Sequence, residues 1–158
     1  MPEGFTKSLA DQLAKKSRLK VAEAAEKDLL VPGRVLIAPG GHHMVVRMAD
    51  GQIEIAINDS PPVKSCRPSV DVLFSSAAGI VKGTILTVVM TGMGNDGTDG
   101  VRVLSRYQSY NLAQDEATCT VYGMPRAVVE EGLADEILPL FRIAQRINEL
   151  VGNGAQVP

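Results

Sequence analysis

An unbroken apolar run that ends in a glycine-rich turn constrains the fold of this chain more than any other stretch. Residues 84–90 read Thr-Ile-Leu-Thr-Val-Val-Met, and residues 91–97 read Thr-Gly-Met-Gly-Asn-Asp-Gly. A short apolar run bounded by glycines is typical of a strand buried inside a parallel sheet. Residues 101–104 then begin a helix pattern, and ligands of such sheets bind just beyond the carboxyl ends of the strands. The sequence therefore predicts a functional site at residues 91–97.

Strand and helix patterns alternate along most of the chain. This alternation predicts a doubly wound α/β fold, in which a mostly parallel sheet carries helices on both faces. Asp50-Gly51 between two alternating segments predicts one antiparallel hairpin, and Thr6 and Ser69 are the expected N-caps of the first two helices. The expected helices are 6–17, 70–77, 99–109, 124–132 and 139–150, and the expected strands are 19–24, 34–38, 44–48, 52–57, 84–90 and 110–113.

Composition excludes several classes of protein. The 158 residues are 45% apolar and 22% charged, which is typical of a single soluble globular domain. A net charge of −2 argues against a basic nucleic-acid-binding face, and no apolar run approaches the ~20 residues of a membrane span. Two distant cysteines argue against a disulfide or zinc framework and favour the cytoplasm. We expect one domain over residues 1–151 and a disordered tail over residues 152–158.

Asp96 is the one acid inside the glycine-rich turn, and two interpretations of it stay open. Its carboxylate can orient a histidine or accept backbone N–H bonds, or Asn95-Asp96 can simply cap the next helix. Residues 92–97 also match the pattern G-x-G-x-x-G. With Asp115 or Glu116 about 20 residues further on, that pattern would indicate a nucleotide-binding domain.

The other chemically active side chains do not form a recognisable site. His42 and His43 are adjacent on extended backbone and point opposite ways, so they make a poor metal pair, and we expect both to be exposed loop residues. The contexts of Cys66 and Cys119 match no nucleophile motif, which favours ordinary, at least half-buried thiols. Every serine lies outside a G-x-S-x-G context. The residues alone thus predict neither a nucleophile nor a base, and no metal or cofactor.

Several linked motifs resemble the catalytic domain of CheB-type chemotaxis methylesterases. They are Met-Pro-Glu-Gly-Phe-Thr at 1–6, Ile-Ala-Pro-Gly at 37–40, Arg-Pro-Ser-Val-Asp-Val-Leu-Phe at 67–74, the turn at 91–97, Gln-Asp-Glu at 114–116 and Gly-Met-Pro at 123–125. They occur in the order and spacing of the family. The resemblance extends from Met1 to about Val151, which implies a partial methylesterase catalytic domain over residues 1–151.

The resemblance implies a Ser-His-Asp triad on a doubly wound α/β domain. Asp96 would be the catalytic aspartate, and Met93 would offer its backbone N–H to the oxyanion. The implied reaction is removal of methyl groups from glutamates on the cytoplasmic helices of chemoreceptors, and deamidation of receptor glutamines. It implies no cofactor, metal, nucleic acid or membrane insertion.

The chain also departs from the family pattern. In the family the serine and histidine precede the Met-Pro-x-Gly-Phe segment, which here begins at Met1, so the family's first two strands are missing. We therefore expect an amino-truncated fragment that is inactive alone and can self-associate through an exposed sheet edge. A monodisperse monomer would contradict self-association. A non-catalytic receptor-binding module is the alternative function, followed by the nucleotide-binding domain.

Overall fold

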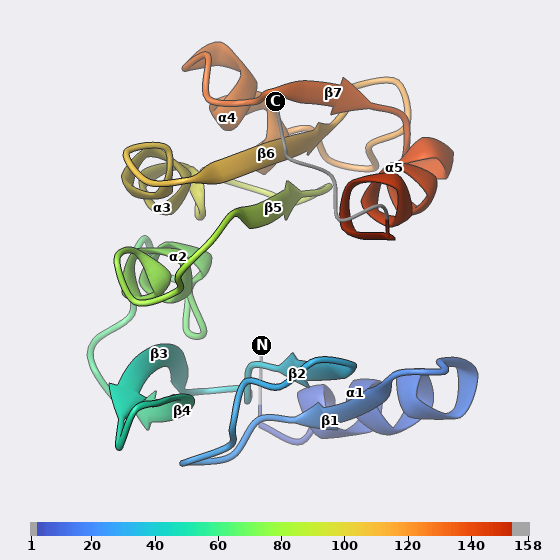
Figure 1. Cartoon of the computed structure of the whole chain (residues 1–158). Helices are drawn as coiled ribbons and strands as arrows, with labels where there is room; N and C mark the ends of the chain where they lie inside the picture. Colours follow the sequence, from blue (N-terminus) through green and yellow to red (C-terminus); the bar gives the residue numbers. More distant parts are fainter. Residues whose placement is uncertain (1–2, 153–158) are drawn as a thin grey trace. The chain divides into compact units, whose positions relative to one another are not determined.

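The computed structural model describes residues 3–152, and the chain forms two compact units, Met1–Ile80 and Val81–Pro158 (Figure 1). Each unit buries its own apolar side chains. The first unit is centred on Ala10, Ala24, Met44, Val46, Ile55 and Ala56, and the second on Val89, Val101, Leu104, Leu112, Ala113, Val128, Ile143 and Leu150. Residues 153–158 of the expected tail at 152–158 lie outside the described residues, whereas Gly152 is the last residue of a helix, so the prediction is wrong for that residue.

The first unit contains a parallel strand pair and an antiparallel hairpin. Its elements are α1 (Phe5–Lys16), β1 (Lys20–Glu23), β2 (Arg34–Ile37), β3 (His43–Ala49), β4 (Gln52–Asn58) and α2 (Val70–Ala77). β1 pairs in parallel with β2, and β3 pairs antiparallel with β4. The φ angles of Asp50 and Gly51 are 49° and 77°. Positive φ at both central residues is what a two-residue type I′ hairpin turn requires, and β3 pairs with β4 on either side of it, so the hairpin prediction is confirmed.

The two predicted N-caps have different outcomes. The Ser69 hydroxyl accepts the Val72 N–H at the start of α2, as expected. The prediction for Thr6 is wrong, because Gly4 holds the N-cap position of α1. Thr6 is buried inside the helix, where its hydroxyl donates to Glu23 Oε1 (2.5 Å) and accepts the Gly40 N–H (2.8 Å). Its hydroxyl therefore ties α1 to the carboxyl ends of β1 and β2 instead of capping the helix.

The second unit is a three-stranded parallel sheet in the order β5-β6-β7 (Figure 1). Its elements are β5 (Ile85–Val89), α3 (Thr98–Leu104), β6 (Ser109–Gln114), α4 (Met124–Glu130), β7 (Glu136–Leu138) and α5 (Leu140–Gly152). The predicted α/β class with parallel strands and one antiparallel pair is confirmed. β7 is not predicted from the sequence, because its three residues are too few to show a strand period. α3 ends at Leu104, which is earlier than expected. A turn follows, in which the Tyr107 N–H donates a hydrogen bond to the Leu104 carbonyl (2.8 Å).

A half-buried ionic network joins three elements of this unit. Glu136 on β7 accepts hydrogen bonds from the Tyr110 hydroxyl of β6 (2.5 Å) and from Nη2 (2.6 Å) and Nε (2.8 Å) of Arg146 on α5. The Arg146 guanidinium holds the pKa of Glu136 below its usual value near 4.5. The hydrogen bond to Glu136 and burial together raise the pKa of Tyr110.

Glu136→Gln is expected to lower the free energy of unfolding by about 1–2 kcal/mol at pH 7, because charge-assisted bonds become weaker neutral ones. A carboxyl group whose pKa is lower in the folded state than in the unfolded state stabilises the fold at any pH above the unfolded-state pKa. This stabilisation is lost as the pH falls through the folded-state pKa. The difference between wild type and Glu136→Gln should therefore shrink below pH 4.5.

Urea denaturation at pH 7 and at pH 3 measures both effects. Glu130→Gln is the matched control, because Glu130 pairs with Arg126 on the exposed surface of α4. That substitution should cost less than about 0.5 kcal/mol. Equal costs for the two variants, or a Glu136→Gln cost that does not change with pH, would contradict this role of the network.

Candidate active site

The glycine-rich turn follows β5 and leads into α3, as the sequence predicts. Gly94 and Gly97 have φ angles of 81° and 94°. These values lie in the left-handed region that side chains with a Cβ rarely adopt. Gly97 holds the N-cap position of α3, so neither Asn95 nor Asp96 occupies it. The turn therefore needs its glycines for backbone shape.

Asp96 lies within this turn, one residue before the N-cap of α3, and its residue surface is only 5% exposed. The N-terminus of a helix favours a nearby negative charge. Burial combined with this position makes Asp96 the carboxylate of the second unit that best fits a site built from the end of β5.

A second segment packs against the first half of the turn. The carbonyl of Gly92 accepts the N–H groups of Gly123 (3.1 Å) and Met124 (2.9 Å), and the Gly92 N–H donates to the Val121 carbonyl (3.0 Å). A Cβ on Gly123 would lie 2.7 Å from the Gly92 oxygen and 2.9 Å from the Gly94 nitrogen. Only glycine at position 123 allows this approach of backbone to backbone.

Met93 stands on this supported turn with its side chain pointing outward, 85% exposed. Within residues 3–152 we find no hydrogen-bond acceptor for its backbone N–H. Backbone N–H groups on a rigid turn are the donors that oxyanion holes use, because they need no rearrangement during the reaction. The backbone N–H of Met93 can therefore donate a hydrogen bond to an oxygen atom of a ligand.

Asp115 has a different environment from the one the nucleotide-binding hypothesis needs. Its Oδ1 accepts hydrogen bonds from the Thr118 N–H (3.0 Å) and the Thr118 hydroxyl (2.5 Å). The carboxylate therefore closes a local turn, whereas a dinucleotide site would direct it to a ribose hydroxyl. The geometry of Asp115 argues against that function.

The two histidines behave differently from each other. His43 begins β3 and is fully buried, so its predicted exposure is wrong. Its Nδ1 accepts the Ser69 N–H (3.2 Å), and its Nε2 lies 3.2 Å from the Pro61 carbonyl. Nε2 must then carry the hydrogen, because a carbonyl can only accept. The His43 ring thus accepts one hydrogen bond from the loop before α2 and donates another to it. No sequence pattern reveals that the loop needs such a buried ring.

His42 is half-buried and lies between two acids. Its Nδ1 bonds to Asp59, and its Nε2 lies 3.6 Å from Glu3 Oε1. The two histidines thus face different partners, as expected for neighbours on extended backbone. In the part of the chain that the structure describes, no three His, Cys, Asp or Glu side chains are grouped to hold a metal ion. Within the same residues, no helix is long and apolar enough to cross a membrane.

Both cysteines are free and half-buried, as predicted. Burial raises the pKa of the Cys119 thiol, and the Asp115 carboxylate acts in the same direction. A raised pKa keeps the sulfur protonated at neutral pH, and the thiolate is the reactive form. Cys119 is therefore a poor nucleophile.

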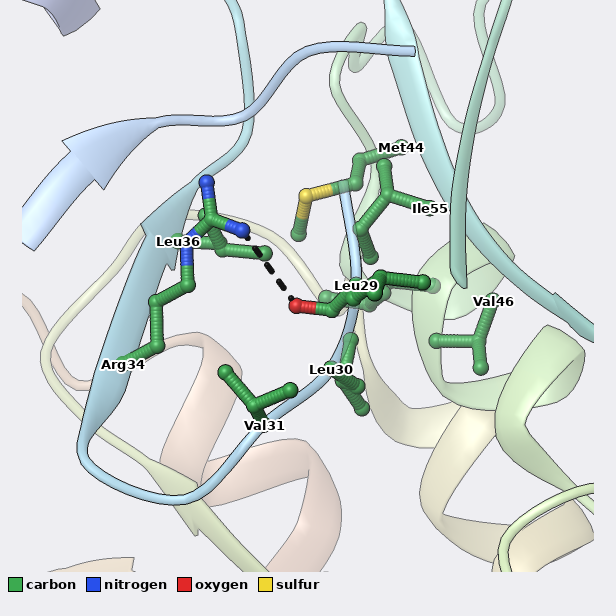
Figure 2. Close-up of a pocket in the computed structure, with 9 residues that line it drawn as sticks. Leu29, Leu30, Val31, Arg34, Leu36, Met44, Val46 and Ile55 are labelled. Atoms are coloured by element: carbon green, nitrogen blue, oxygen red, sulfur yellow. Dashed lines mark hydrogen bonds between the residues drawn. The ribbon is translucent and has the colours of Figure 1, made fainter. Parts of the chain in front are cut away.

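An apolar hollow of about 240 Å³ lies in the first unit (Figure 2). Its lining comes from residues 29–31, β2, β3, β4 and α2, with Met44 and Ile55 among the buried side chains. Arg34 is the charged residue of the lining, and its guanidinium is occupied by the Leu29 carbonyl (3.4 Å) and Asp28 (2.7 Å). Neither Asp96 nor Met93 is among the residues that line this hollow.

Comparisons with known proteins agree on one family. The family model described as CheB methylesterase matches residues 1–147. A protein-glutamate methylesterase/protein-glutamine glutaminase of Pseudomonas aeruginosa is 46% identical over 144 residues, which cover 91% of this chain and 41% of that protein. A protein of the same name from Symbiobacterium thermophilum is 46% identical over 154 residues, which cover 98% of this chain and 42% of that protein.

A solved structure gives the same result. The crystal structure of the Thermotoga maritima CheB methylesterase catalytic domain matches with a TM-score of 0.91 and 42% identity, over 96% of this chain and 80% of that chain. The chain spans about two fifths of the length of the two curated relatives. The family match extends over most of the chain and agrees with the observed fold. The chain belongs to the CheB methylesterase family.

Proposed function

We propose that this chain supplies the acid and the oxyanion turn of a protein-glutamate methylesterase. The substrate would be methylated glutamate on the cytoplasmic helices of chemoreceptors, which would place the protein in the cytoplasm. The glutaminase reaction in the names of its relatives would be a second reaction of the same site. The observation that carries this proposal is the buried Asp96 in a turn whose backbone is held by a second segment.

The proposed roles follow from the chemistry of ester hydrolysis. A serine oxygen attacks the ester carbonyl while a histidine takes its proton, methanol leaves, and water then releases the glutamate from the serine. Asp96 would accept the second N–H of that histidine, which fixes its tautomer and stabilises its charged form. Met93 would donate its backbone N–H to the oxygen that becomes negative.

We further propose that the 158-residue chain does not hydrolyse esters by itself. By resemblance to the family, the serine and histidine would lie in a segment before the motif at residues 1–6. His42 and His43 already bond to Asp59, Ser69 and Pro61. A general base must reach both the nucleophile and the orienting acid, and these histidines are held by other partners.

Methanol release from a receptor carrying labelled methyl esters tests both proposals. The first sample is the 158-residue chain, which should release no more methanol than buffer. The second, called here the extended chain, carries at its N-terminus the segment of the Thermotoga maritima domain that precedes the counterpart of residues 1–6. It should release methanol catalytically. Activity of the 158-residue chain would refute its inactivity, and an inactive but folded extended chain would refute the methylesterase proposal.

A receptor-binding module without catalysis is the second candidate. Both histidines are already hydrogen-bonded to other groups, which favours this candidate for the chain by itself. Receptor binding by the extended chain without methanol release would support this alternative. Self-association through a sheet edge also stays a proposal, supported by the two-stranded β1-β2 pair, whose sheet contains no further strand among the described residues.

A further inference from the structure

We infer that Gln114 is a positioning residue that holds the oxyanion turn in place. Gln114 is the last residue of β6, and its residue surface is 1% exposed. Its Oε1 accepts the N–H of Thr91, the first residue of the turn (2.9 Å). The inference rests on the proposed role of the Met93 amide, which lies two residues further along the same turn.

The other end of the Gln114 amide fixes its orientation. Nε2 donates to the Thr118 carbonyl (2.8 Å) and lies 3.2 Å from the Thr118 hydroxyl. If the amide rotated by half a turn, its oxygen would face the Thr118 carbonyl oxygen, and two acceptors would oppose each other. The hydrogen bond from Nε2 to the Thr118 carbonyl therefore keeps the Gln114 oxygen directed toward the Thr91 N–H.

Thr118 is itself held from two sides. Its hydroxyl donates to Asp115 (2.5 Å) and accepts the N–H of Leu140 at the start of α5 (2.9 Å). The contacts thus run from α5 through Thr118 and Gln114 to the first residue of the turn. Buried polar groups linked in this way restrict the backbone because each lost bond leaves a partner unsatisfied.

The turn has a second support that leaves Gln114 a distinct task. The Thr91 hydroxyl accepts the Val121 N–H (2.9 Å) and donates to the Val121 carbonyl (3.1 Å), and Gly92 bonds to the same carbonyl. These contacts fix the turn toward the 121–124 segment. Gln114 fixes it toward the end of β6, which sets the direction in which the backbone leaves the sheet.

Amide NMR spectra of the 158-residue chain test this inference. Gln114→Met keeps the length of the side chain and removes both hydrogen-bonding groups. We expect the Thr91 amide to exchange with solvent about tenfold faster, as the loss of one hydrogen bond predicts. The cross-peaks of Met93 and Gly94 should also shift or broaden, because the turn loses its hydrogen bond to the end of β6. Gln145→Met is the matched control, because the Gln145 side chain donates to Glu149 on the exposed surface of α5.

Unchanged Met93 and Gly94 cross-peaks in a folded Gln114→Met chain would overturn the inference. If that variant does not fold, Thr118→Val provides the second test. It removes the hydroxyl that supports Gln114 and should shift the same two cross-peaks by a smaller amount, whereas no shift would overturn the inference. The cross-peaks report on the turn whether or not the extended chain releases methanol, so failure of the inference and failure of the proposed function can be distinguished.

Discussion

Asp96→Asn is expected to lower the kcat of the extended chain about 10⁴-fold, the loss found when a triad aspartate becomes an amide. Asparagine has nearly the same size as aspartate, but it carries no negative charge and can donate a hydrogen bond. The histidine would then adopt the wrong tautomer, and its charged form would lose its partner. Substrate binding does not need the carboxylate, so kcat and kcat/KM should fall together.

Initial rates of methanol release over a range of receptor concentrations measure this effect. Asp50→Asn is the control, because Asp50 lies in the exposed hairpin turn with a φ of 49°, where asparagine is well tolerated. Its kinetics should match those of the unmodified extended chain. An Asp96→Asn variant that keeps kcat within tenfold would refute the role proposed for Asp96 while leaving the family assignment intact.

Gly123→Ala is expected to destabilise the 158-residue chain by about 1–3 kcal/mol, the usual cost of forcing an extra methyl group into a packed site. The added Cβ would lie 2.7 Å from the Gly92 oxygen and 2.9 Å from the Gly94 nitrogen. Both atoms belong to backbone, so neither can move without displacing the turn itself. The same displacement should lower kcat in the extended chain, because Met93 lies between Gly92 and Gly94.

Urea denaturation of three glycine variants separates this contact from a general effect of alanine. Gly152→Ala should be neutral or slightly stabilising, because open space surrounds that position at the end of α5. Gly92→Ala should cost less than Gly123→Ala, since its Cβ would meet the flexible end of the Met124 side chain. Equal stability of the Gly123→Ala and Gly152→Ala chains would contradict the proposed close approach.

The elements that the sequence predicts correctly are those whose signals are local. The existence of strand β5, the hairpin at Asp50-Gly51 and the capping of α2 by Ser69 depend on neighbouring residues alone. The predicted burial of β5 inside the sheet is wrong, because β5 is an outer strand of the β5-β6-β7 sheet and three of its five residues are only half-buried. Periodicity and turn chemistry act over a few residues, so they can be detected without knowing the partners. β7 was missed because its three residues are too short for a period, and its place is set by pairing with β6.

Errors about single residues share one physical cause. Thr6 looks like a helix cap and His43 looks like an exposed loop residue, yet both are buried and bond to groups 17 to 34 positions away. A polar side chain that serves a distant backbone group has no local pattern, because its partners are adjacent only after folding. Gln114 is another polar side chain that serves a distant backbone group, since its partner Thr91 follows the end of a different strand.

The sequence by itself determined the α/β class, the position of the glycine-rich turn and the family to which the turn belongs. Glycine and apolar patterns carry that information because backbone conformation and burial are imposed residue by residue. Only the tertiary structure decided that Asp96 is buried, that Gly123 packs against Gly92, and that Gln114 holds Thr91. Those three facts depend on parallel strands ending at one edge of the sheet, which brings residues 91–97, 114 and 121–124 together.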